Sequence, residues 1–126
     1  MNPLLIEALI AVESGNGIVP TGDDNAIGDK GLAHKAYGCL QIRQPVCDDV
    51  NRVYNLALTA EQMLGNRALS VDTLGKYVAI YCTPRRLGHA PNDQDRARTW
   101  NGGPAGPWEN ATIKYWQKVQ RAMGGT

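Results

Sequence analysis

Phenylalanine is missing from the sequence altogether, and the aromatic residues present are three tryptophans and five tyrosines. Their rings carry an N–H or O–H group, which suits the wall of a partly wet cleft as well as an ordinary core. A large net charge is missing too, because 13 basic residues are balanced by 12 acidic ones, leaving a formal charge of +1. Such a chain has no overall field to attract nucleic acid or an anionic membrane. We expect neither as a partner, so an anionic substrate must be bound locally.

Cysteine is scarce and odd in number. Cys39, Cys47 and Cys82 cannot all pair within one chain, which argues against a small secreted domain framed by disulfides. Two states of the cysteines stay open: one disulfide bridge with one free thiol, or three reduced thiols. The sequence has no Cys-x-x-Cys pair, and His34 and His89 stand far apart. We therefore expect no metal site.

Long apolar runs are absent as well, since none approaches the roughly 20 residues that cross a bilayer. The apolar start, residues 1–10, has no basic leader and is interrupted by Glu7, so it predicts a helix of the mature protein and not a signal peptide. The length suits one domain with one core. We expect residues 1–126 to form that domain and to act as a monomer.

Glycine, proline and asparagine divide the sequence into helices and one irregular insert. Asn2 and Pro3 can cap and begin a helix that stops near Gly15. Residues 16 to about 37 are rich in Gly, Asp, Asn and Pro, which predicts loops and a small hairpin. Apolar periodicity and breakers predict helices over about 46–55, 70–82, 93–100 and 110–123.

Three finer expectations concern the ends and faces of these helices. Thr59 and Gln62 have the spacing of a capping box. Pro84 is expected to end the preceding helix. The last helix is expected to carry its apolar side chains inward, namely Ile113, Trp116, Val119 and Met123.

Glu13 lies where the first expected helix passes from apolar residues into the loop. A carboxyl there can be partly desolvated, which raises its pKa toward neutral pH. A raised pKa is what the proton donor to a glycosidic oxygen needs. Asp29, flanked by Gly28 and Gly31, can present a second carboxyl across a cleft. Taken singly, Glu13 is better interpreted as a solvated glutamate at a helix end, and Asp29 as an ordinary turn residue.

Five short motifs nevertheless follow one another in order. They are Glu13-Ser14-Gly15, Ala-Ile-Gly-Asp-Lys-Gly at 26–31, Tyr-Gly-Cys-Leu-Gln-Ile-Arg at 37–43, Trp-Asn-Gly-Gly at 100–103, and Tyr115-Trp116. The set resembles the lysozyme superfamily, and within it the lytic transglycosylases and the invertebrate-type (destabilase) lysozymes. The resemblance covers residues 4–55 well and 96–118 loosely. It implies a mainly α, lysozyme-like α+β fold, with a cleft between a helical bundle and the hairpin insert.

The resemblance also implies roles for individual residues. Glu13 matches the catalytic acid, and Ser14 the adjacent hydroxyl that helps to hold it. Asp29 resembles the second acid of the invertebrate type, which transglycosylases lack. Substrate-binding positions would be Gly38, where backbone approaches the sugar, and Asn101. Gln41 matches a glutamine whose amide contacts substrate or orders the site. Tyr115 resembles a late tyrosine that hydrogen-bonds near the acid. Tyr37 and the three tryptophans could line the cleft or pack inside.

These residues predict a muramidase. Glu13 would protonate the oxygen between N-acetylmuramic acid and N-acetylglucosamine, and Asp29 would act as nucleophile or stabilise an oxocarbenium-like transition state. No cofactor is implied. A lytic transglycosylase, in which Asp29 is structural, and a non-catalytic glycan-binding or virion module are the alternatives, and chitin is an alternative substrate. Action on the cell wall without a signal peptide would require another delivery route, such as a phage lysis system.

Overall fold

The first helix, α1 (Pro3–Ser14), has the bounds that its sequence signals predict. In the computed structural model, which describes residues 1–124, the Asn2 side chain accepts a hydrogen bond from the backbone N–H of Leu4 at 3.0 Å. Pro3 occupies the first turn, where its missing N–H leaves no helical bond unmade. At the other end the N–H of Gly15 donates to the carbonyl of Ala11. Glu13 is thereby fixed in the last turn, beside the loop.

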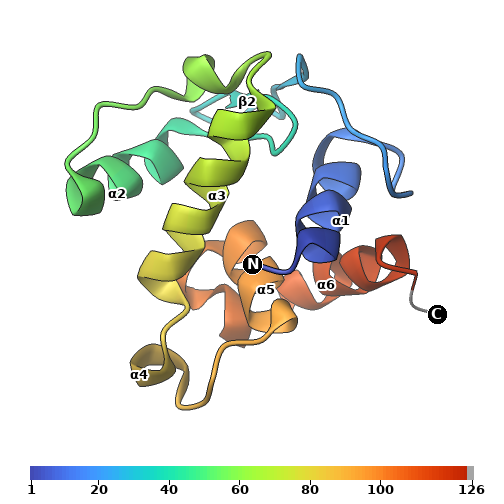
Figure 1. Cartoon of the computed structure of the whole chain (residues 1–126), viewed down its shortest axis with the longest axis vertical. Coiled ribbons are helices and arrows are strands. Elements are labelled where there is room, and N and C mark those ends of the chain that lie inside the picture. Colours follow the sequence, from blue (N-terminus) through green and yellow to red (C-terminus); the bar gives the residue numbers. More distant parts are fainter. Residues whose placement is uncertain (125–126) are drawn as a thin grey trace.

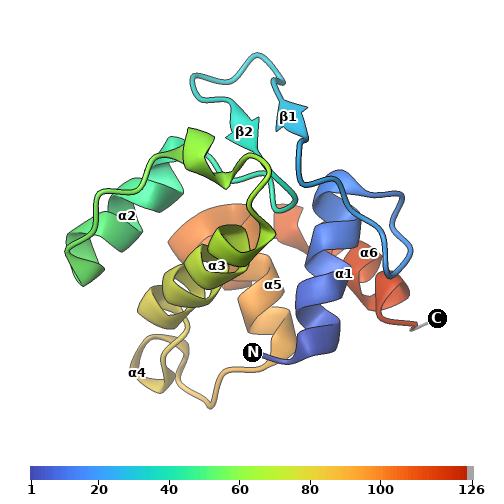
Figure 2. The same cartoon turned by 45° about the horizontal axis from the view of Figure 1, so that its top comes forward.

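The insert that follows α1 contains a two-stranded antiparallel hairpin. Strands β1 (Ile27–Gly28) and β2 (Ala36–Tyr37) pair with Ile27 opposite Tyr37. Figure 2 shows this hairpin above the helices, joined to α1 by a long loop. The predicted hairpin is confirmed.

The remaining chain is helical and folds around α5. Its elements are α2 (Gln44–Tyr54), the 3-10 helix η1 (Ala60–Met63), α3 (Arg67–Tyr81), α4 (Pro84–Leu87), α5 (Asp93–Gly102), the 3-10 helix η2 (Gly103–Trp108) and α6 (Ala111–Ala122). Helix α5 contacts α1, α3 and α6, and it lies between α1 and α3 in Figure 2. Figure 1 shows α3 and α1 as separate arms that rise toward the hairpin. The predicted mainly α architecture with one small hairpin is confirmed.

Helix bounds differ from those expected by up to three residues, and two of the differences concern the ends of α3. Helix α3 begins three residues early, because the side chain of Asn66 accepts from the N–H of Leu69 and caps it. Pro84 does end α3, but it also begins the short helix α4, since the Thr83 hydroxyl accepts from the N–H of Arg86. The predicted Thr59 capping box is confirmed at the start of η1, where the Gln62 side chain accepts from the N–H of Thr59 at 3.1 Å.

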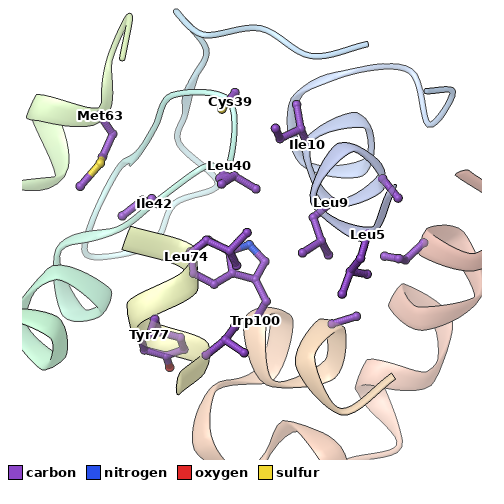
Figure 3. Close-up of a cluster of buried hydrophobic side chains, with 14 of the residues drawn as sticks. Leu5, Leu9, Ile10, Cys39, Leu40, Ile42, Met63, Leu74, Tyr77 and Trp100 are labelled. Atoms are coloured by element: carbon purple, nitrogen blue, oxygen red, sulfur yellow. The ribbon is translucent and has the colours of Figure 1, made fainter. Parts of the chain in front are cut away.

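The core joins α1 to the segment after the hairpin and to α3, α5 and α6. Figure 3 shows buried hydrophobic side chains from several of these elements converging. Its fully buried members include Leu5, Leu9, Ile10, Leu40, Ile42, Leu74 and Val119. All three cysteines are buried and free, so the alternative with three thiols is the one the structure has. In the described part of the chain, no helix has both the length and the hydropathy to cross a membrane.

Three of the four side chains expected to face inward from α6 do so, namely Trp116, Val119 and Met123, and Ile113 does not. Ile113 is 40% exposed, whereas its neighbour Thr112 is buried. The Thr112 hydroxyl donates to the carbonyl of Gly106 at 2.6 Å and accepts from Arg98 Nε. Because these bonds satisfy the buried hydroxyl, threonine can take the inward position that apolar periodicity gave to isoleucine.

Candidate active site

An open cleft of about 470 Å³ lies beside the end of α1. Glu13 lines it from α1, Lys30 from the hairpin turn, Gln41 and Arg43 from the segment after β2, and Asn101 from α5. Its more apolar wall consists of Leu32, Val46, Tyr77 and Trp100. The cleft therefore combines one carboxyl and several hydrogen-bonding groups with a wall on which a sugar ring can pack.

Glu13 is half-buried, and its carboxyl is the most perturbed acid in the described structure. Desolvation by the surrounding protein raises the pKa of Glu13 from 4.5 to about 7, and it outweighs the opposing effects of the Tyr115 hydrogen bond and of the charges on Lys30 and Arg43. At neutral pH the carboxyl is thus protonated in a large fraction of molecules. A proton donor with this pKa, open to a cleft, is suited to general acid catalysis.

Tyr115 holds the carboxyl from the far end of the chain. Its hydroxyl donates to Glu13 Oε2 at 2.7 Å and bridges α6 and α1. Burial, followed by the nearby Glu13 charge, raises the pKa of Tyr115 well above its ordinary value, so the hydroxyl stays a donor. Since Oε2 accepts the Tyr115 hydrogen bond, Oε1 is the oxygen left to carry a proton. The hydrogen bond that the resemblance implied is present.

If Glu13 acts as a general acid, Tyr115→Phe is expected to move the alkaline limb of the profile of kcat/KM against pH to higher pH. The hydrogen bond lowers the pKa of Glu13, so its loss raises that pKa, and activity that needs the protonated acid persists further as pH rises. A hydrogen bond of ordinary strength corresponds to roughly half to one pH unit. The measurement is kcat/KM against pH, with exposed Tyr54→Phe as control. A limb that stays in place or moves to lower pH would contradict this role.

Gln41 ties the cleft to the hairpin. Its Nε2 donates to the carbonyl of Gly38 at 3.0 Å and to that of Ala26 at 3.3 Å. Its Oε1 lies where a side chain at Gly28 would collide, since a Cβ there would be 2.2 Å away. Of the two roles that the sequence suggested, the structure shows the ordering one, because both amide hydrogens bind protein carbonyls.

Gly38 and Ser14 serve contacts within the protein. Gly38 is buried with φ +81°, and a Cβ there would lie 2.7 Å from the backbone oxygen of Met63. The backbone that approaches Gly38 is therefore that of η1. The Ser14 hydroxyl donates to the carbonyl of Cys39 at 2.7 Å and accepts from the N–H of Asp23 at 2.9 Å. It fastens α1 to the insert and makes no bond to Glu13.

Asp29 lies one residue beyond β1 and is exposed. Its Oδ1 accepts from the N–H of Gly31 at 3.1 Å, the bond of an ordinary turn aspartate. Lys30, its neighbour in the chain, lines the cleft, whereas Asp29 is not among the lining residues. The structure thus brings Glu13, Gln41, Asn101 and Tyr115 together but leaves Asp29 outside that group.

The remaining aromatic candidates lie in four different environments. Trp100 lines the cleft while packing edge-on against Tyr77, with ring centroids 5.7 Å apart. Trp108 is 58% exposed, and Trp116 packs against the core. Tyr37 is half-buried and lines a separate hollow of about 280 Å³ with His34 and neighbouring residues. Among the tryptophans, Trp100 is the one placed to contact a ligand in this cleft.

Three lysines near Glu13 were not singled out from the sequence. Lys30, Lys114 and Lys118 line a second hollow that Glu13 and Tyr115 also border. The one signal available in the sequence is the spacing of Lys114 and Lys118, which places them on one helix face next to Tyr115. Lys30 comes from an irregular loop, where no periodicity locates a side chain.

Comparisons with known proteins agree with this fold. No protein-family model matches the sequence, and no curated protein does. A chain in the crystal structure of Aeromonas hydrophila PliI in complex with Meretrix lusoria lysozyme superposes with a TM-score of 0.78 and 19% identity, covering 100% of this chain and 96% of that one. Tapes japonica lysozyme superposes with a TM-score of 0.75 and 23% identity, covering 95% and 89%. The chain has the fold of these lysozymes.

Proposed function

We propose that this chain, with its lysozyme fold, is a peptidoglycan-degrading glycosidase. As a muramidase it would cleave the β-1,4 bond between N-acetylmuramic acid and N-acetylglucosamine, a substrate that lies outside the cell membrane. The observation that carries the proposal is the Glu13 carboxyl, whose pKa is raised to about 7 at the edge of an open cleft. A lysozyme-like fold alone would not distinguish an enzyme from a binding module.

In the proposed reaction, Glu13 gives its proton to the glycosidic oxygen. The C–O bond breaks as that oxygen leaves with the proton as a hydroxyl, and positive charge develops on the sugar ring. The Glu13 carboxylate that results accepts the Tyr115 hydrogen bond and faces the positive charges of Lys30 and Arg43. These groups stabilise it until it removes a proton from the attacking nucleophile.

The second carboxyl of the muramidase would be Asp29. It lies on the same turn as cleft-lining Lys30, so a movement of that exposed turn onto bound sugar would carry the Asp29 carboxyl toward the reacting carbon. There it would act as nucleophile or stabilise the positive ring. The bond to Gly31 would have to break in that movement.

The position of Asp29 favours a second candidate, a lytic transglycosylase. Glu13 is the one acidic residue among those that line the cleft of the described structure. A single acid suffices if the substrate's own N-acetyl and hydroxyl groups displace the leaving group. The product would then carry a 1,6-anhydro end in place of a reducing end.

Asp29→Asn combined with product analysis separates the two. If Asp29 is the second acid, mass spectrometry should show reducing ends, and the substitution should lower kcat by roughly a hundredfold or more. Under the transglycosylase alternative, anhydro ends appear and the variant stays near normal activity. Asp72→Asn is the control, because the Asp72 side chain is 57% exposed and pairs with Lys76 one turn along α3. Anhydro ends, together with normal activity of the Asp29→Asn variant, would overturn the proposal that the chain is a muramidase.

A further inference from the structure

A second hollow, of about 310 Å³, adjoins the cleft at Glu13. Glu13, Lys30 and Asn101 border both spaces. Helix α6 contributes Lys114, Tyr115 and Lys118 to the second hollow. A glycan whose scissile oxygen meets Glu13 would therefore extend on one side along the wall of Trp100 and Tyr77. On the other side it would enter the hollow bordered by α6.

The second hollow concentrates positive charge in a chain that is almost neutral. Lys30, Lys114 and Lys118 all line it, whereas the whole chain has a formal charge of only +1. Within residues 1–124, the salt bridges formed by basic side chains use other residues than these three. Their charges are thus not balanced by direct ion pairs with protein carboxylates.

The spacing on α6 adds to this. Lys114 and Lys118 stand four residues apart, where like charges destabilise a helix by a few tenths of a kcal/mol. Glu13, the acid at the hollow, carries only part of a negative charge at neutral pH because its pKa is about 7. An anion from outside would relieve the repulsion among the lysines.

A cell-wall glycan carries a suitable anion, a carboxylate. N-acetylmuramic acid has a lactyl carboxylate, free or amide-linked to a stem peptide that brings carboxylates of its own. A chitin chain of N-acetylglucosamine has none. Ammonium groups bind carboxylates through charge-assisted hydrogen bonds, so the hollow distinguishes two glycans that share the same backbone linkage.

We propose that the hollow lined by Lys30, Lys114 and Lys118 binds a carboxylate carried by the sugar next to the scissile bond, and so selects acidic wall glycan over neutral chitin-type glycan. The inference rests on the proposed function, which places a glycan across Glu13. It adds the chemical class of substituent that the site recognises.

Binding of monosaccharides, followed by NMR titration, tests the proposal without cleavage. The probes are N-acetylmuramic acid, muramyl dipeptide and N-acetylglucosamine. The intact chain should bind at least one acidic probe more tightly than N-acetylglucosamine. Lys114→Gln with Lys118→Gln should reduce that preference roughly fivefold to tenfold, as expected for two exposed ion pairs. Added salt should weaken it in the same direction.

Matched variants show whether charge at this place is what matters. Lys35→Gln with Arg121→Gln removes the same charge from exposed positions outside the hollow and should leave the preference unchanged. Lys114→Arg with Lys118→Arg should keep it. Far-UV circular dichroism confirms that each variant is folded.

The binding results show whether the carboxylate belongs to the lactyl group or to the stem peptide. They also test the carboxylate site separately from the proposed enzymatic activity. Preference for N-acetylmuramic acid identifies the lactyl group, and preference for muramyl dipeptide alone identifies the stem peptide. Equal binding of acidic and neutral probes, or a preference that survives the double glutamine variant, overturns the inference. None of these probes contains a glycosidic bond between two sugars, so binding is measured independently of cleavage. Failure of the proposed enzymatic activity would appear in a separate experiment, as intact peptidoglycan.

Discussion

Glu13→Gln is expected to lower the rate of peptidoglycan cleavage on the order of a thousandfold while the chain stays folded. The glutamine amide has nearly the shape of the carboxyl and can still accept the Tyr115 hydrogen bond, but it has no acidic proton to give. The rate of fragment release under substrate saturation measures the effect, because the substitution should act on kcat more than on KM.

Glu7→Gln is the matched control for this variant. Glu7 lies on the same helix, about 4.0 Å from Arg67, with its side chain 41% exposed. It should keep full activity.

Stability gives an independent check on Glu13→Gln. The pKa of Glu13 is raised in the folded chain, so its contribution is favourable at low pH and is lost as pH rises through about 7. At pH 8 the glutamine variant should therefore be at least as stable as the wild type. Near-normal cleavage by a folded Glu13→Gln chain would refute the assignment of the acid.

Gly38→Ala is expected to reduce the free energy of unfolding by about 2–4 kcal/mol. Its φ of +81° is left-handed, which costs an alanine about 1–2 kcal/mol. The new Cβ would also meet the backbone oxygen of Met63 at 2.7 Å. Met63 is fully buried, so its backbone can move only by disturbing the core. Urea unfolding measures the loss.

Gly17→Ala separates the two contributions. Gly17 has φ +79°, but a Cβ there meets nothing within 4 Å, so only the backbone penalty of about 1–2 kcal/mol applies. Gly38→Ala should be clearly more destabilising than Gly17→Ala. Equal losses would mean that close packing against η1 contributes nothing at this position. The carbonyl of Gly38 also accepts from Gln41, so the packing here supports the cleft.

Local signals in the sequence were sufficient to predict an element of the fold where they act through neighbouring residues. Asn2 and Pro3 cap and begin α1 by bonds within one turn, so the position of Glu13 at the end of that helix was predictable. The start of α3 was missed because the Asn66 cap precedes the apolar stripe. One inward position of α6 was assigned to Ile113 in place of Thr112, because the buried Thr112 hydroxyl is satisfied by Gly106, a tertiary contact.

The site was less predictable than the fold because its parts meet across the chain. Glu13 and Tyr115 are separated by 102 positions, and no periodicity joins them, so only the resemblance to lysozyme-type motifs suggested their contact. Lys30 lines both the cleft and the second hollow from an irregular turn. The burial that raises the pKa of Glu13 likewise comes from several elements. A helix-end glutamate shows in the sequence, but its desolvation belongs to the tertiary structure.

Glu13 as the acid of a glycan-cleaving enzyme is tested most directly on purified peptidoglycan. Wild-type and Glu13→Gln chains are incubated with it side by side, and soluble fragments are identified by mass spectrometry. The wild-type chain should release fragments cut between N-acetylmuramic acid and N-acetylglucosamine, and the variant should release almost none. Release at equal rates by both chains, or no release by the folded wild type, would contradict the proposed function.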